Sequence, residues 1–177
     1  MPHKNKERKA SLERKSTETQ IKVKLNIEGT GKSKINTQIG ILDHMLELFA
    51  FHGYFDLEIE VKKADLKIDI HHTNEDVGIV LGKAFKEALG DKVGIRRFGS
   101  AFVPMESTLG HTVVDISGRG YYKLRTAQAG LAPKTEDGYA FRDAEHLFEA
   151  FAKHLGMNLN LMVDPLSSDL HTTLEPI

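Results

Sequence analysis

Alternation of apolar and polar side chains marks the strands expected in the first half of the chain. Apolar residues take every second position in residues 20–29 and again in residues 55–61, the pattern of half-buried strands. Two shorter segments, residues 33–40 and 66–70, are expected to be their partners, the second as the return strand of a hairpin. The first half therefore predicts four strands.

Helical spacing interrupts this alternation twice. In residues 41–53 the apolar side chains fall on one side of a helix that ends at Gly53, and in residues 73–91 they form one stripe that stops at Gly90. The predicted order of the first half is β-β-α-β-β-α, which places the chain in the α/β class, as an α+β arrangement.

The second half repeats part of the first. A shift of 102 residues sets residues 43–61 over residues 145–163 and matches His44 with His146. Two similar amphipathic units would share apolar positions by chance, but apolar periodicity does not require the same histidine pattern. We interpret the match as an internal duplication.

The duplication predicts one domain made of two pseudo-repeats. Their bounds are expected at about residues 16–92 and 93–177, with residues 1–15 as a frayed, solvated N-terminus. A chain of 177 residues with 40% hydrophobic and 28% charged residues is large enough for such a domain.

Composition excludes several classes of partner and ligand. A formal charge of -1 gives no global attraction to nucleic acid or membranes, and no apolar run has the length of a spanning helix. The absence of cysteine fits a cytoplasmic protein and excludes disulfides and cysteine-based zinc sites. Any metal would have to be bound by nitrogen and oxygen.

The sequence HHTNED at residues 71–76 is the first candidate for such a site. On a helix, His71 and Glu75 lie about 40° apart, as do His72 and Asp76, so two neighbouring faces could each reach a cation. The spacing alone leaves two interpretations open, a metal site or the polar start of an ordinary helix. Imidazole with carboxylate in a cysteine-free protein suits Mn, Fe, Zn or Ni.

The duplication favours the metal interpretation, because HTTLE at residues 171–175 repeats the His/Glu pair at the expected distance. His44 and His146, each near the start of a helix ahead of one motif, are natural additional ligands. In the second copy Thr172 replaces the second histidine.

Seven motifs follow one another along the chain: STET (16–19), DHMLELFAFHG (43–53), HHTNEDVGIVLG (71–82), GIRRFG (94–99), VPM (103–105), DISGR (115–119) and EHLFEAFAKHLG (145–156). In these motifs the chain resembles the imidazoleglycerol-phosphate dehydratase family of histidine biosynthesis. The resemblance implies a duplicated fold with sheets packed on a helical layer, a cytoplasmic homo-oligomer, commonly a 24-mer, and active sites between subunits.

The resemblance also implies a lyase that dehydrates imidazole-glycerol phosphate to imidazole-acetol phosphate with two Mn²⁺ ions per site. The implied metal ligands are His44, His71, His72, Glu75, His146, His171 and Glu175. The implied substrate contacts are Glu18, His52, Arg97 and Arg119. Glu18, His72 and Glu75 are the expected catalytic residues, with Glu18 exchanging protons with the substrate carbon, while guanidinium groups suit the phosphate.

Three departures from the family pattern keep a second hypothesis open. Thr172 should leave one metal a protein ligand short, Ser107 replaces one of two acidic residues after VPM, and the chain stops at Ile177 before an expected last helix. The sequence is therefore expected to be a C-terminally truncated or a divergent member. The alternative function is a catalytically impaired or repurposed metal-binding assembly subunit.

Overall fold

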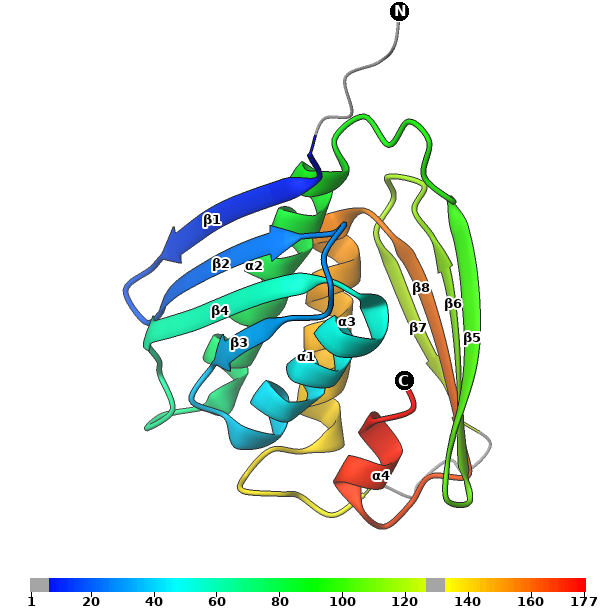
Figure 1. Cartoon of the computed structure of the whole chain (residues 1–177). Coiled ribbons are helices and arrows are strands. Elements are labelled where there is room, and N and C mark those ends of the chain that lie inside the picture. The colour runs from blue at the N-terminus through cyan, green and yellow to red at the C-terminus, as the bar shows by residue number, and fades with distance from the viewer. Residues whose placement is uncertain (1–6, 127–132) are drawn as a thin grey trace, which may run out of the picture.

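The protein is a three-layer sandwich in which two sheets enclose a layer of helices. The computed structural model describes residues 7–126 and 133–177. One four-stranded sheet lies on each side of the helices α1, α2 and α3 (Figure 1). None of the helices within the described residues is long and apolar enough to cross a membrane.

The first sheet has the strand order β1-β2-β4-β3. Its members are β1 (Lys9–Lys15), β2 (Gln20–Asn26), β3 (Ser33–Asn36) and β4 (Asp56–Lys63). The alternation predicted for β2 and β4 is realised, since Val23 and Ile59 are opposite each other in the register and both are buried in the core. Strand β3 runs parallel to β4, whereas the other pairs are antiparallel.

The second sheet repeats this arrangement with the order β5-β6-β8-β7. Its members are β5 (Phe98–Met105), β6 (Thr108–Asp115), β7 (Tyr121–Arg125) and β8 (Asn158–Asp164). Here too the third strand, β7, is the one that runs parallel to its neighbour, β8. Equal strand order and equal directions confirm the internal duplication.

Within residues 7–126 and 133–177, four helices complete the two units. They are α1 (Gly40–Gly53), α2 (Ile70–Leu89), α3 (Phe141–Leu155) and α4 (Leu170–Leu174). Helices α2 and α3 form the central contact of the layer, and α2 faces β1 and β2 while α3 faces β7 and β8. Along the chain each unit is therefore β-β-β-α-β-α.

The predicted strand at residues 66–70 is wrong. This segment forms turns that lead into α2, and Asp69 caps the helix by accepting a hydrogen bond from the His71 N–H at 2.9 Å. The physical reason is that β4 already has a partner on each edge, β2 on one side and β3 on the other. A returning strand would have no free backbone groups with which to pair.

The prediction of a frayed N-terminus is wrong for residues 9–15, which form β1. This strand pairs with β2 along its whole length, from Lys9 opposite Asn26 to Lys15 opposite Gln20. Its charged residues hide the alternation, because only Ala10 and Leu12 supply apolar side chains toward the core. The first unit thus begins at Lys9, before the predicted boundary at residue 16, while residues 1–6 lie outside the described part of the chain.

Candidate metal centre

The predicted metal ligands gather at the N-terminal turns of the helices. The motif HHTNED opens α2 and HTTLE opens α4, while His44 and His146 lie in the second turns of α1 and α3. Asn74 joins two of these ends, because its side-chain amide donates to the Asp143 carbonyl at 2.6 Å and its carbonyl accepts from the Tyr139 hydroxyl at 2.8 Å. This buried contact sets the start of α2 against the start of α3.

The first histidine cluster consists of His71, Glu75 and His146. The Nδ1 atoms of His71 and His146 are 3.0 Å apart, and His71 Nε2 lies 3.6 Å from the Glu75 carboxylate. Glu75 and His146 therefore face opposite nitrogens of one imidazole ring. The residue types suit a cation, but a ring rotation would be needed to bring the three donors onto one point.

The second histidine cluster consists of His44, His171 and Glu175. Here His171 Nε2 lies 3.0 Å from His44 Nε2 and 3.1 Å from the Glu175 carboxylate. All three donor atoms lie within 4.8 Å of one another, so they do converge. Two imidazole nitrogens with one carboxylate oxygen fit a divalent ion such as Mn²⁺, Fe²⁺ or Zn²⁺.

Each cluster combines the two repeats. In the first cluster the His/Glu pair comes from the first repeat and the single histidine from α3, whereas the second cluster takes its single histidine from α1 and its pair from α4. Each repeat therefore supplies one histidine to the cluster whose His/Glu pair belongs to the other repeat. Neither repeat could build either cluster alone.

His72 does not join its neighbour His71. Its Nδ1 atom lies 3.0 Å from the Asp65 carboxylate and 3.9 Å from that of Glu18, and the imidazole side chain is 41% exposed. The hydrogen bond that His72 Nδ1–H donates to the Asp65 carboxylate, with a further contribution from the charge of Glu18, raises the pKa of His72 above its usual value. Glu18, Asp65 and His72 form a third group whose donor atoms lie within 4.8 Å of one another.

Sequence reasoning missed Asp65. It lies seven residues before His72, directly ahead of the segment that was predicted to be a strand, so no helical spacing connected the two residues. Only the turn between β4 and α2 brings them into contact.

Asp76 has a structural role instead of the cation contact that helical spacing offered. It is buried and accepts hydrogen bonds from Arg14 Nε at 2.8 Å and from the Thr19 hydroxyl at 2.6 Å. These bonds tie the β1–β2 hairpin to the first turns of α2. The Glu18 carboxylate, next to Thr19 in that hairpin, is thereby held near His72.

We expect Asp76→Ala to lower the free energy of unfolding by about 2 kcal/mol, since two charge-assisted hydrogen bonds are lost and the Thr19 hydroxyl loses its acceptor. Denaturant unfolding would measure this loss. The number of metal ions bound should not change. A lower metal stoichiometry in the folded variant would show that Asp76 is a ligand after all.

The predicted substrate contacts His52, Arg97 and Arg119 lie away from the clusters. His52 is in the last turn of α1, about 12 Å along the helix from His44. Arg119 follows Gly118, whose N–H donates at 2.8 Å to the carbonyl of Gly156, and this C-cap of α3 is about 15 Å along the helix from His146. Within a single chain, these predicted substrate contacts are therefore far from the metal ligands.

Arg97 is held in a bidentate ion pair. Its Nε and Nη2 atoms donate to the two carboxylate oxygens of Asp115 at 2.6 and 3.0 Å. The guanidinium lowers the pKa of Asp115, and the carboxylate raises that of Arg97. Both side chains remain partly exposed, so the guanidinium can still be reached from solvent.

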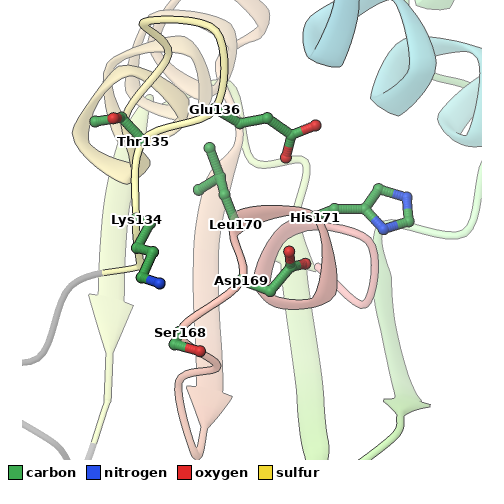
Figure 2. Close-up of a pocket in the computed structure, with 7 residues that line it drawn as sticks. All are labelled: Lys134, Thr135, Glu136, Ser168, Asp169, Leu170 and His171. Atoms are coloured by element: carbon green, nitrogen blue, oxygen red, sulfur yellow. The ribbon is translucent and has the colours of Figure 1, made fainter.

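A polar cavity of about 510 Å³ opens beside the second histidine cluster (Figure 2). Its lining residues are Lys134, Thr135, Glu136, Ser168, Asp169, Leu170 and His171. Figure 2 shows His171 at one side of the cavity and Lys134 at the other. His171 therefore belongs both to the cavity lining and to the second histidine cluster.

The family model of imidazoleglycerol-phosphate dehydratase matches residues 37–175. The chain belongs to this family. The imidazoleglycerol-phosphate dehydratase of Geobacter metallireducens is 50% identical over 157 residues, which cover 88% of this chain and 78% of the relative. That of Pseudomonas fluorescens is 43% identical over 172 residues, 97% of this chain and 84% of the relative.

Solved structures of the family have the same fold. The Staphylococcus aureus imidazoleglycerol-phosphate dehydratase aligns with a TM-score of 0.82 and 31% identity, over 96% of this chain and 91% of that one. The Pyrococcus furiosus enzyme, solved in complex with (S)-C348, aligns with a TM-score of 0.76 and 32% identity, over 93% and 85% of the two chains. The family and the fold class predicted from the motifs are confirmed.

Proposed function

We propose that this chain is a hydro-lyase that converts imidazoleglycerol phosphate to imidazole-acetol phosphate in histidine biosynthesis. The observation that carries the proposal is the pair of histidine clusters, each with two imidazoles and one carboxylate built from both repeats. Family members that share half of its residues are dehydratases by name. The alternative of an impaired assembly subunit has no support in these comparisons.

We propose Mn²⁺ as the cofactor, two ions per site, with the first cluster holding one and the second cluster the other. His72 is proposed as a further ligand, and one of the two ions is expected to lack a histidine because Thr172 occupies the equivalent position. A bound Mn²⁺ would act as a Lewis acid on the imidazole ring of the substrate.

The remaining roles fall to side chains of the protein. The Glu18 carboxylate, exposed at the β1–β2 turn, would exchange a proton with the side-chain carbon of the substrate, and its distance of 3.9 Å from His72 places it beside a proposed ligand. Arg97 and Arg119 would donate to the phosphate oxygens, with the Asp115 carboxylate keeping the Arg97 guanidinium in a fixed plane. Glu75 and Glu175 would offset part of the metal charge.

The separation of these groups supports an active site between copies of the chain. A substrate with its ring at the first histidine cluster cannot also reach Arg119 of the same chain near the far end of α3, about 15 Å along the helix axis from His146. A second copy could supply the missing arginines. The homo-oligomer, its size of 24 subunits and the cytoplasmic location remain predictions.

Purified protein tests the proposal directly. We expect turnover of imidazoleglycerol phosphate with Mn²⁺ and loss of turnover on chelation, with recovery when Mn²⁺ is returned. Metal analysis should give two ions per chain. Tight metal binding without any turnover would favour the alternative subunit function.

Arg119→Ala should raise KM about tenfold or more with a smaller change in kcat, because each lost charge-assisted bond to phosphate is worth about 1.5–3 kcal/mol. Steady-state kinetics would measure both constants. Arg125→Ala is the matched control, since Arg125 is an exposed arginine at the end of β7, the strand that follows Arg119, and is bonded to Asn160. Equal KM values for the two variants would argue against a phosphate role for Arg119.

A further inference from the structure

Asp65 is fixed on the first turn of α2 by contacts other than the one with His72. Its backbone N–H donates to the hydroxyl of Thr73 at 3.0 Å, and its carbonyl accepts from the Asp69 N–H at 3.2 Å. Thr73 is fully buried, and the Asp65 side chain is only 15% exposed. The carboxylate that meets His72 Nδ1 at 3.0 Å is therefore in a defined position.

This contact decides which nitrogen of His72 can bind a metal. A carboxylate accepts but does not donate, so it holds the proton of a neutral imidazole on Nδ1 and leaves the lone pair on Nε2. Nε2 lies across the ring from Nδ1, and the side chain is 41% exposed. His72 thus has its free donor directed away from Asp65, while the two histidine clusters are formed without it.

The second repeat contains the same turn without the two functional groups. Ser167 donates its N–H to the hydroxyl of Thr173 at 3.2 Å, the bond that Asp65 makes to Thr73. Ser167 therefore occupies the place of Asp65, and Thr172, directly before Thr173, occupies the place of His72. A carboxylate and an imidazole have both been replaced by hydroxyl side chains.

The third member of the group is replaced as well. Glu18 lies in the β1–β2 turn and precedes the buried Thr19, and Ser107 lies in the β5–β6 turn and precedes the buried Thr108. The second repeat thus has Ser107, Ser167 and Thr172 where the first has Glu18, Asp65 and His72. The three residues whose donor atoms lie within 4.8 Å of one another in the first repeat are thus all absent from the equivalent positions of the second.

We propose that Asp65 is the positioning residue of His72. The second repeat lacks this carboxylate–imidazole pair as a unit, and the two proposed metal ions are therefore bound with unequal affinity. The inference rests on the proposed metal sites and adds a residue that the ligand set does not contain. It also states what the second repeat lacks: a histidine at position 172 would need a carboxylate at position 167.

Replacing Asp65 tests whether this residue positions His72. Asp65→Ala should weaken Mn²⁺ binding at one class of site about 10–100-fold, the usual cost of losing the orienting partner of a ligand, with the other class unchanged. Titration calorimetry measures both classes. The ¹⁵N shifts of His72 in metal-free protein should show the Nδ1–H form in the wild type and a mixture of tautomers in the variant.

Ser167→Ala is the matched control, because it changes the equivalent position where no imidazole is present. It should leave both classes of metal binding as in the wild type. Unchanged affinities and unchanged His72 shifts in Asp65→Ala would overturn the positioning role. Equal weakening of both classes together with a lower Tm would also overturn it, by showing a merely structural effect.

Introducing the carboxylate–imidazole pair into the second repeat tests whether a histidine at position 172 needs a carboxylate at position 167. The double variant Ser167→Asp/Thr172→His should strengthen the weaker class of Mn²⁺ binding about tenfold or more beyond Thr172→His alone. An equal gain from the single substitution would overturn the need for the carboxylate. If the wild type binds no Mn²⁺, the proposed metal sites fail, whereas the His72 shifts still decide the role of Asp65.

Discussion

His171→Ala will abolish metal binding at the second histidine cluster and lower kcat/KM by about a thousandfold or more. His171 contacts both other members of the cluster, His44 at 3.0 Å and Glu175 at 3.1 Å. Its removal therefore eliminates both of these contacts and leaves only two of the three donor side chains. The Lewis acid is worth several kcal/mol of transition-state stabilisation, and each 1.36 kcal/mol is about tenfold in rate. Metal analysis and steady-state kinetics on the same preparation measure the two losses.

His154→Ala is the control for this experiment. His154 lies in the last turn of α3, where its Nδ1 contacts the Ala150 carbonyl at 2.9 Å, and it belongs to neither cluster. It should keep both ions and near wild-type activity. If His171→Ala retains the full metal content, the second cluster does not bind metal and the proposed site must be revised.

Gly82→Ala will destabilise the fold by about 2 kcal/mol, although alanine is the better helix former by about 1 kcal/mol. A Cβ at Gly82 would lie 2.6 Å from the Phe151 carbonyl oxygen and 3.0 Å from the Leu155 nitrogen. Both atoms belong to the backbone of α3, so the two central helices would have to separate. Because His71 is on α2 and His146 on α3, the first histidine cluster should also bind metal more weakly.

Gly40→Ala provides the comparison. Gly40 is the first residue of α1, and a Cβ there would meet nothing within 4 Å. Thermal unfolding should show a lower Tm for Gly82→Ala alone. A Tm for Gly82→Ala at or above that of the wild type would mean that α2 and α3 can repack around the added methyl group.

Local pattern was enough where one face of an element is buried. The strands β2 and β4 and the helices α1 and α2 follow from the period of their apolar residues, because burial on one face imposes that period. Pattern failed for β1, whose charges mask a short apolar face, and for residues 66–70, where alternation is present but β4 has no free edge. Pairing depends on which strands already occupy the sheet, and a local period does not contain that information.

For the candidate site, the sequence by itself determined which residue types are available. HHTNED, its copy HTTLE and the matched His44 and His146 gave the ligands and the nitrogen and oxygen chemistry. Only the tertiary structure decided how they combine, because contact between α2 and α3 and between α1 and α4 joins residues 75 and 127 positions apart.

Tertiary structure also assigned partners that spacing could not assign. Asp76, one helical turn from His72, is bonded to Arg14 and Thr19, and His72 pairs with Asp65 across a turn. Periodicity fixes the direction of a side chain relative to its own helix axis, whereas the partner it meets depends on the elements packed against that helix. The sequence thus determined the donors and the fold class of this protein, and the packing of its two repeats decided the clusters.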